Sequence, residues 1–265
     1  MKLALAQFGA TTDKAHNLAQ LREFATRAAA DGAELVVFPE FTMYEKKVVD
    51  ASFAEAAEPL DGPFCLAVAE VAAMLGIAVT VGVVERNDHD FRPFNTLVAI
   101  GPAGERLARY RKVHLFDSYG FRESDAISPA ESLDPVVFTV ADITVGLMTC
   151  YDLRFPELGR ELADAGAQVM LACSSWVPGE MKVEQWRVLA QARAIENGCY
   201  VGAVSQTPPT SIGRSLFVTP MGNIAGQLDE EPALGIFDAQ PREVSATRER
   251  DPALLRRRYL VTRRQ

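Results

Sequence analysis

The stretch ITVGLMTCYDLRFPE, residues 143–157, decides the fold. It begins with an apolar run typical of a buried strand, and a helical pattern follows that ends at Gly166. Cys150 falls where the strand pattern gives way to a turn and then to the helix. Reactive side chains favour such strand ends because a rigid sheet positions them. The stretch therefore predicts an α/β fold with a candidate nucleophile at the edge of a sheet.

Two further segments place a charged side chain after a strand-like run. Glu40 follows the apolar run 35–38, and Lys112 follows the extended segment 106–111. A thiol at its ordinary pKa is only partly ionised at neutral pH, so a nucleophilic cysteine needs a base and a positive charge nearby. Glu40 can supply the base and Lys112 the charge. Together with Cys150 they predict amide-bond chemistry through a cysteine thioester.

Strand-like and helix-like patterns alternate along the whole chain. Hairpins and helix-connected strands occur together, which favours α/β layers in which helices cover buried strands. No low-complexity linker interrupts the pattern, so we expect one domain over residues 1–265, with about 240–265 as a terminal helix and arm used in packing or oligomer contacts. The expected helices are 13–32, 65–75, 155–165, 180–196 and one from about 241, and the expected strands are 3–8, 35–38, 77–84, 95–100, 106–111, 136–140, 143–148, 169–172, 200–205, 215–219, 224–228 and 234–237.

Composition excludes several classes of protein. A hydrophobic fraction of 48% supports a sizeable core, and a net charge of −8 argues against a nucleic-acid binder. The arginines at 256–258 and 263–264 are an exception that we interpret as a solvated tail. No apolar run approaches the ~18 residues of a membrane span, and segment 1–7 lacks the pattern of a cleaved signal. These features predict a cytoplasmic protein without membrane contacts.

The four cysteines are widely spaced and form no C-x-x-C pair. This spacing disfavours both a disulfide framework and a zinc site, and it fits reduced thiols. Cys65, Cys173 and Cys199 have no base in a recognisable frame and are interpreted as small core residues. His114 lies two residues from Lys112 and is expected to make a structural hydrogen bond rather than to act in catalysis.

The three segments in their local frames resemble the carbon–nitrogen hydrolase (nitrilase) superfamily. The motifs are VVFPE at 36–40, YRKVHLF at 110–116 and CYDLRFPE at 150–157, and the resemblance extends from residues 4–7 to 193–197. It implies a four-layer α-β-β-α sandwich and a homodimer or higher homo-oligomer. The ω-amidase and deaminated-glutathione-amidase branch is the nearest analogy.

The resemblance also implies a second glutamate, Glu123, which contacts Lys112 and helps to orient the substrate. The candidate catalytic residues are then Glu40, Lys112, Cys150 and Glu123. Glu40 takes the thiol proton, the thiolate attacks the amide carbonyl, and Lys112 with the backbone N–H of Tyr151 stabilises the oxyanion. Water activated by Glu40 then releases the acid from the thioester. No metal and no organic cofactor is needed, because nucleophile, base and donors all belong to the chain.

Specificity is less well defined by the sequence. Relatives of the ω-amidase type have Gly-His-Ser where residues 213–215 read Gly-Arg-Ser. Arg214 is therefore a candidate partner for a substrate carboxylate, with a surface salt bridge as the alternative. Trp176 is a candidate pocket wall. Asp152 and Arg154 are expected to form a buried ion pair that orients the nucleophile turn, with substrate binding as the alternative.

The chain is thus interpreted as a hydrolase of carbon–nitrogen bonds other than peptide bonds, an amidase converting a small linear carboxamide to acid and ammonia. A nitrilase or an N-acyltransferase using the same Glu-Lys-Cys site is the alternative. A non-catalytic binding or scaffold protein is a further one, although it has no need for Glu40, Lys112, Glu123 and Cys150 together. The expected partner is a small-molecule amide, with no nucleic acid and no membrane.

Overall fold

Strands near the N-terminus are buried on both faces, as strands between two layers are. In β1 (Lys2–Gln7), Leu3 and Leu5 belong to the apolar cluster that also contains the residues of the C-terminal half. Ala4 and Ala6 point the other way, into a cluster with helical residues of the N-terminal half. The alternation follows from the two-residue period of a strand. It places β1 between a second sheet and a layer of helices.

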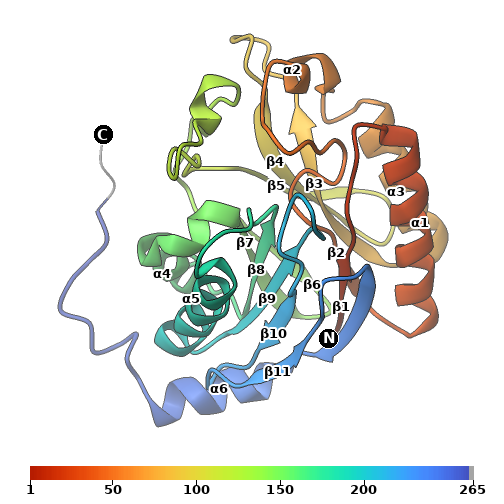
Figure 1. Ribbon diagram of the computed structural model, residues 1–265. Helices are drawn as coiled ribbons and strands as arrows, with labels where there is room; N and C mark the ends of the chain where they lie inside the picture. The colour runs from red at the N-terminus through yellow and green to blue at the C-terminus, as the bar shows by residue number, and fades with distance from the viewer. Residues whose placement is uncertain (263–265) are drawn as a thin grey trace.

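Two six-stranded sheets pack face to face in the computed structural model, which describes residues 1–262 (Figure 1). The first sheet has the order β12-β1-β2-β3-β4-β5 and the second has the order β11-β10-β9-β8-β7-β6. The remaining strands are β2 (Leu35–Val37), β3 (Ala78–Glu85), β4 (Phe94–Ile100), β5 (Arg106–Arg111), β6 (Val137–Val140), β7 (Ile143–Thr149), β8 (Val169–Ser174), β9 (Tyr200–Ser205), β10 (Leu216–Val218), β11 (Ile224–Gln227) and β12 (Ala233–Asp238).

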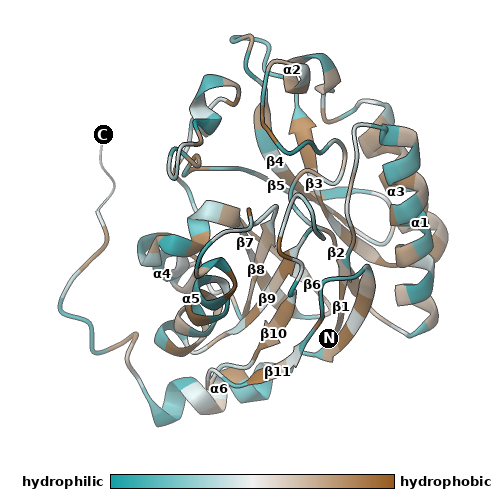
Figure 2. Cartoon of the chain, viewed as in Figure 1, coloured by the Kyte–Doolittle hydropathy of each residue, from teal (hydrophilic) through white to brown (hydrophobic). Residues whose placement is uncertain are grey.

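Helices cover the outer face of each sheet. The first sheet carries α1 (Lys14–Ala30) and α3 (Pro63–Leu75), and the second carries α4 (Pro156–Asp164) and α5 (Lys182–Asn197) (Figure 1). The strands are mostly apolar, whereas the helices turn hydrophilic residues outward (Figure 2). The predicted four-layer α-β-β-α sandwich is confirmed.

Element boundaries differ from the sequence prediction where local geometry decides them. The helix expected from 180 begins at Lys182, because Met181 has a left-handed backbone with φ 57°. A 3-10 helix, η2 (Cys150–Arg154), lies between β7 and α4. The short helix α2 (Ser52–Ala56) and the 3-10 helix η1 (Glu123–Asp125) were not expected. Such single turns are too short to leave a periodic apolar pattern.

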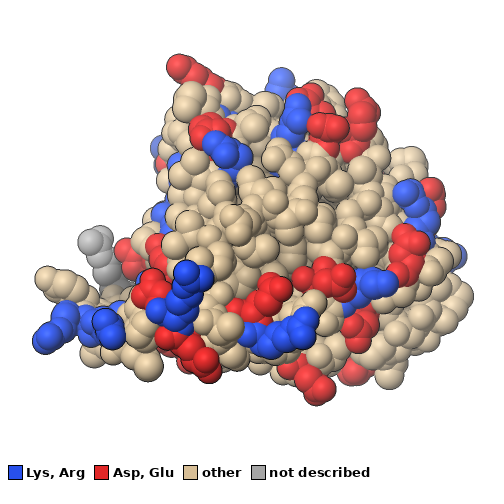
Figure 3. All heavy atoms as spheres, turned by 90° about the horizontal axis from the view of Figure 1, so that it is seen from below, with Lys and Arg blue, Asp and Glu red and all other residues tan. Residues whose placement is uncertain are grey.

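The C-terminal part begins with α6 (Pro241–Arg250). This helix is joined to β9 of the second sheet by a hydrogen bond that the Tyr200 hydroxyl donates to Glu243. An irregular arm follows, and within it Arg257 pairs with Asp164 at 2.7 Å. Acidic and basic side chains are interspersed on the face shown in Figure 3. The expected arginines at 263 and 264 lie outside the described residues. A role of this arm in oligomer contacts stays a prediction.

Within residues 1–262, no helix combines the length and the apolar character that crossing a membrane requires.

Candidate active site

Glu40 is held at the end of β2 by a close backbone approach. The segment that carries it crosses Gly82 of β3, where a Cβ would lie 2.7 Å from the Glu40 Cα and 2.6 Å from the Pro39 carbonyl oxygen. Only a residue without a side chain fits there. Two backbone hydrogen bonds, from Gly82 to Pro39 and from Met43 to Gly82, fix the segment. The Glu40 side chain is 1% exposed.

Cys150 begins η2 directly after β7, with a left-handed φ of 47°. A non-glycine residue in this region persists only where its surroundings hold it, and such strain is concentrated at functional sites. Here Asp152 holds the turn. Its fully buried carboxylate accepts hydrogen bonds from the Thr149 N–H at 2.9 Å, the Tyr110 hydroxyl at 2.6 Å and the His114 N–H at 3.0 Å.

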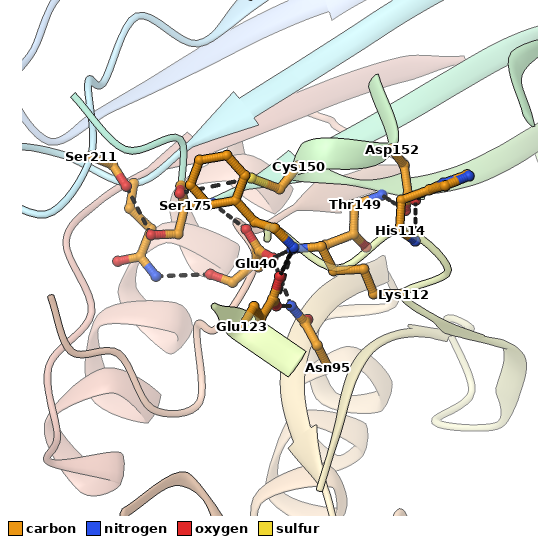
Figure 4. A network of polar contacts seen from close by, with 12 residues as sticks. Glu40, Asn95, Lys112, His114, Glu123, Thr149, Cys150, Asp152, Ser175 and Ser211 are labelled. Carbon is orange, nitrogen blue, oxygen red and sulfur yellow. Dashed lines mark hydrogen bonds and ion pairs between the residues drawn. The ribbon is translucent and has the colours of Figure 1, made fainter. Parts of the chain in front are cut away.

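Lys112 follows β5 and lies between two carboxylates. Its Nζ is 2.9 Å from Oε1 of Glu40 and 2.8 Å from Oε2 of Glu123. All three side chains are nearly completely buried. Figure 4 shows them pointing toward one another beside Cys150. The structure therefore brings together the four predicted catalytic residues, which are distributed between positions 40 and 150 of the chain.

Two further residues brace this cluster. Nδ2 of Asn95, on β4, donates to Oε1 of Glu40 at 2.6 Å and lies 3.2 Å from Oε1 of Glu123. The backbone N–H of Ser175 donates to Oε2 of Glu40 at 2.6 Å. The carbonyl of Ser175 accepts a hydrogen bond from the Cys150 thiol at 3.8 Å. The side chains are thus fixed before any substrate arrives, which is the preorganisation that catalysis requires.

The charges of the cluster shift its pKa values. Burial raises the pKa of Cys150 well above its usual range, and the Glu40 carboxylate raises it further, against the opposing effect of Lys112. Burial by itself lowers the pKa of Lys112, but Glu123 and Glu40 outweigh it and raise that pKa well above its ordinary value. In the resting site the Cys150 thiol is therefore neutral and Lys112 keeps its positive charge. Burial raises the pKa of Glu123 as well, against the opposing effect of Lys112.

A pocket of about 420 Å³ opens at these residues. Its inner end holds Glu40, Lys112 and Cys150, and a third buried carboxyl group, Glu45, also lines it. Burial raises the pKa of Glu45 well above its usual value, and the neighbouring Glu40 adds to this effect. A pocket of this size suits a small organic substrate.

Residues 2–249 match the family model for carbon-nitrogen hydrolases. The chain belongs to the carbon-nitrogen hydrolase family. It is 40% identical to Hydrolase Rv0480c of Mycobacterium tuberculosis, over 94% of this chain and 93% of that protein. It is 32% identical to the deaminated glutathione amidase of Escherichia coli, over 98% of both. The predicted family is confirmed, and the protein is a hydrolase of carbon–nitrogen bonds other than peptide bonds.

Solved structures of carbon-nitrogen hydrolases share the fold. Nit3 of Saccharomyces cerevisiae, a member of branch 10 of the nitrilase superfamily, superposes with a TM-score of 0.87 at 26% identity, covering 98% of this chain and 97% of that one. A variant of the amidase from Nesterenkonia sp. AN1 superposes with a TM-score of 0.83 at 29% identity, covering 97% and 94%. That structure shows covalent addition of the acetamide moiety of fluoroacetamide at its active-site cysteine.

Of the three predicted oxyanion and substrate-binding residues of this carbon-nitrogen hydrolase, two lie beside Cys150 and one does not. Tyr151 and Trp176 line a smaller hollow that shares Cys150 with the main pocket. Arg214 lies outside the lining of both and pairs with Asp229 at 2.9 Å and Glu230 at 2.8 Å. The alternative of a surface salt bridge therefore describes Arg214 as the structure places it.

The expected ion pair between Asp152 and Arg154 is wrong. Asp152 satisfies its charge with the donors named above, including His114, which makes the predicted structural hydrogen bond at 2.7 Å through Nδ1. Arg154 turns away and donates to Gln185 at 2.6 Å. Sequence adjacency suggested the pair, but a 3-10 turn sends residues two apart to different sides.

The sequence did not mark Asn95, Ser175 or Glu45 as site residues. No motif marks them. Asn95 reaches Glu40 within the first sheet, from β4, whereas Ser175 reaches it only because the second sheet packs against the first. The only signal for Glu45 was its place as the next charged residue after Phe38-Pro39-Glu40, five positions beyond Glu40. Among residues 1–262, no group of three or more His, Cys, Asp or Glu side chains is arranged to hold a metal ion.

Proposed function

We propose that the protein is an amidase that hydrolyses a small linear carboxamide to a carboxylic acid and ammonia through a thioester on Cys150. The observation that carries the proposal is the buried cluster in which Lys112 lies within 2.9 Å of both Glu40 and Glu123, beside Cys150 at the inner end of the pocket. The Nesterenkonia amidase, which takes a covalent adduct on its active-site cysteine, and the related deaminated glutathione amidase support the same chemistry.

The first step moves the thiol proton to Glu40. Because the pKa of Cys150 is raised, the thiolate forms only as it attacks, and the positive charge of Lys112 remains beside it. The net charge of Glu40, Lys112, Glu123 and Cys150 is the same before and after this transfer. A transfer without a change in total buried charge avoids the desolvation cost of a new ion.

The attack forms the Cys150 Sγ–carbon bond and moves the carbonyl electron pair onto oxygen. Lys112 and the backbone N–H of Tyr151 stabilise that oxyanion. The tetrahedral intermediate collapses as Glu40 returns its proton to the leaving nitrogen, which departs as ammonia and leaves the thioester. Water then gives a proton to Glu40, attacks the thioester carbon and releases the acid, and the thiol regains the proton.

Glu123 acts as a second counter-ion that keeps Lys112 protonated and in place. Its Oε2 also accepts the Phe116 N–H at 2.6 Å, which fixes the carboxylate. We expect it to contact the amide nitrogen of the substrate as well. A nitrilase or an N-acyltransferase would use the same thioester site, with a nitrile carbon as the electrophile or an amine as the final acceptor. A cytoplasmic homodimer or higher homo-oligomer is part of the proposal.

The test is ammonia release from a panel that contains α-ketoglutaramate, deaminated glutathione, simple aliphatic amides and nitriles. Wild type is compared with Cys150→Ala and with Cys65→Ala, a matched control for a buried cysteine on α3. We expect release that disappears in the first variant and persists in the second, and mass spectrometry that finds the acyl adduct on Cys150. A wild-type protein that releases no ammonia from any amide would refute the proposal, and release confined to nitriles would replace it with a nitrilase.

A further inference from the structure

The loop between β5 and η1, residues 112–122, connects two members of the buried cluster. Lys112 begins this loop and Glu123 follows it, and the stretch between them forms no helix or strand. Phe116 lies in the loop, and its N–H donates to Oε2 of Glu123 at 2.6 Å. The same carboxylate oxygen is 2.8 Å from Nζ of Lys112. The position of Phe116 therefore affects where the Glu123 carboxylate meets the ammonium.

The side chain of Phe116 is surrounded by other rings. Its ring centre lies 5.4 Å from that of Phe121 and 6.2 Å from that of Tyr119, both in the same loop. It also lies 5.1 Å from the ring centre of Tyr151, in an edge-to-face arrangement. Tyr151 directly follows Cys150, and its N–H is the proposed oxyanion donor. Phe116 thus links the loop to the nucleophile turn as well as to Glu123.

An ammonium from the second half of the chain lies against these rings. Lys182 is the first residue of α5, and only 6% of it is exposed. Its Nζ is 4.3 Å from the ring centre of Tyr119, 4.7 Å from that of Phe116 and 5.4 Å from that of Trp176. A cation is attracted to the π-electrons of such rings, most strongly where water is excluded. Lys182 therefore joins the 112–122 loop to the start of α5.

A lysine is electrostatically unfavourable at this position. The N-terminus of a helix carries a partial positive charge, which disfavours a cation there. Burial and the nearby Arg154 lower the pKa of Lys182. Within residues 1–262, no ion pair joins Lys182 to a carboxylate, whereas the buried Arg193 binds Glu196 at 2.6 Å. The contacts with the rings therefore account for this lysine better than the stability of the helix does.

The two sides of this contact differ in how firmly they are held. The indole N–H of Trp176 donates to the Lys182 carbonyl at 3.0 Å, and the Lys182 N–H donates to the Gly179 carbonyl at 3.2 Å. These bonds fix the backbone that carries the ammonium. On the loop side, Tyr119 is 63% exposed and has a left-handed backbone with φ 52°. Such a conformation persists only where surrounding contacts hold it. The ammonium thus extends from a fixed support to a loop that needs one.

We propose that Lys182 is a positioning residue for the reaction, because its ammonium holds the 112–122 loop through Phe116 and Tyr119 and thereby keeps Glu123 against Lys112. The inference rests on the proposed amidase function. In this role Lys182 touches neither the substrate nor the reacting atoms. It acts through the Phe116 N–H, which donates to the Glu123 carboxylate. Without the charge, the loop loses one of its contacts and the Glu123 carboxylate is held less precisely.

The first test changes the charge and keeps the apolar stem. In Lys182→Met, we expect kcat for the best amide of the panel to fall by about tenfold, the effect of losing one desolvated cation–π contact. Lys182→Arg keeps a cation that can stack on rings and should retain most of the activity. Arg187→Met removes a cation of the same helix whose side chain is 41% exposed, and it should leave kcat unchanged. A methionine variant with the kcat of wild type, or an arginine variant as impaired as the methionine variant, would overturn the proposal.

A double-mutant cycle tests whether Lys182 acts through Glu123. Residues that act through one another give losses that do not add in free energy. In a Glu123→Gln background, Lys182→Met should therefore lower kcat by only about twofold or less, because the carboxylate that Lys182 helps to hold is already absent. A merely structural role of Lys182 would give the same fold-loss in both backgrounds, and that result would overturn the proposal.

Tyr119 gives a second pair of variants if the Lys182 variants do not fold. Tyr119→Leu removes the ring nearest to the ammonium at a residue that is 63% exposed, so the fold should tolerate the change. Tyr119→Phe keeps the ring. We expect the leucine variant to lose more of its kcat than the phenylalanine variant, and equal values in the two would contradict the role of the ring.

Hydrogen exchange separates this inference from the amidase proposal, because it needs no substrate. Backbone amides in peptides covering residues 113–122 should exchange faster in Lys182→Met than in wild type, and those of β3 should not change. Ammonia release by wild type together with unchanged exchange in the loop would overturn the positioning role and leave the amidase function standing. Faster exchange in the variant of a protein that releases no ammonia would support the contact between Lys182 and the loop and refute the amidase function.

Discussion

The backbone N–H of Ser175 donates to Oε2 of Glu40 at 2.6 Å, and this hydrogen bond joins the ends of the two sheets. Glu40 follows β2 of the first sheet, whereas Ser175 follows β8 of the second. The carbonyl of the same residue accepts from the Cys150 thiol. A single peptide segment therefore positions both the base and the nucleophile, and the site exists only when the sheets are packed together.

Replacing Glu40 by glutamine should remove the base while the carboxamide oxygen can still accept the Ser175 N–H. We expect ammonia release to fall by about 10²–10⁴-fold, the usual contribution of a general base. The measurement is steady-state ammonia release, with thermal unfolding to check the fold. Glu131→Gln, a change at a carboxylate outside the pocket with a side chain 65% exposed, is the control. Comparable activity in both variants would contradict the role of Glu40.

Replacing Lys112 by methionine leaves two carboxylates buried next to each other without a counter-charge. We expect the free energy of unfolding to fall by about 3–5 kcal/mol, as for other broken buried ion pairs. Adding Glu123→Gln should recover part of that loss, because it removes one of the uncompensated charges. Urea unfolding of the two single variants and the double variant measures the coupling. Strictly additive losses would show that the two charges do not interact.

Removing the hydroxyl of Tyr110 tests how Asp152 holds the nucleophile turn. Tyr110→Phe deletes a donor 2.6 Å from a fully buried carboxylate. We expect a loss of about 1.5–3 kcal/mol in the free energy of unfolding, typical of a hydrogen bond to a charged group. Tyr259→Phe, at a residue that is 89% exposed, should cost nothing measurable and is the matched control. Equal stabilities of the two variants would refute the assignment.

Glu45 should make the protein's stability depend on pH. Because burial raises its pKa in the folded state, the folded protein keeps a proton that the unfolded chain releases above pH 4.5. Rising pH therefore favours unfolding until the folded pKa is reached, whereas at lower pH both states are protonated. Relative to Glu45→Gln, wild type should lose up to ~1.4 kcal/mol per pH unit in this interval.

Urea unfolding of wild type and Glu45→Gln at several pH values above 4.5 measures that slope. The exposed Glu180→Gln is the control, and its stability difference from wild type should not vary with pH in the same way. A constant difference between wild type and Glu45→Gln would show that Glu45 ionises normally in the folded protein.

Most of the fold was predictable because local patterns and tertiary packing agree. Asp13 caps α1 through its side chain, and Gly76 and Gly198 end α3 and α5 in left-handed conformations. The apolar runs marked the strands because both faces are buried. What the sequence did not indicate was which strand ends meet across the two packed sheets. No local pattern records that β2 and β8 end at the same place.

The candidate site was predictable to the same degree. Glu40, Lys112 and Cys150 stand at strand ends in distinctive frames, so their convergence was expected. The residues that brace or extend the cluster were not, since Asn95 and Ser175 act through contacts between distant segments. Arg214 was predicted less well. Its place in the Gly-Arg-Ser frame suggested a substrate contact, but it pairs with Asp229 and Glu230, 15 and 16 residues further along the chain.

Gly82 makes the site vulnerable at a position that carries no chemistry. A single added methyl group there would displace the backbone of Glu40, although the sequence would still contain every polar residue of the cluster. A distant homologue can keep the glutamate, the lysine and the cysteine and yet have a larger residue at this position. Such a protein would carry the sequence motifs of the family without positioning the glutamate for catalysis. Assigning activity to such homologues therefore requires checking the residue at the Gly82 position of β3 as well as the reactive residues.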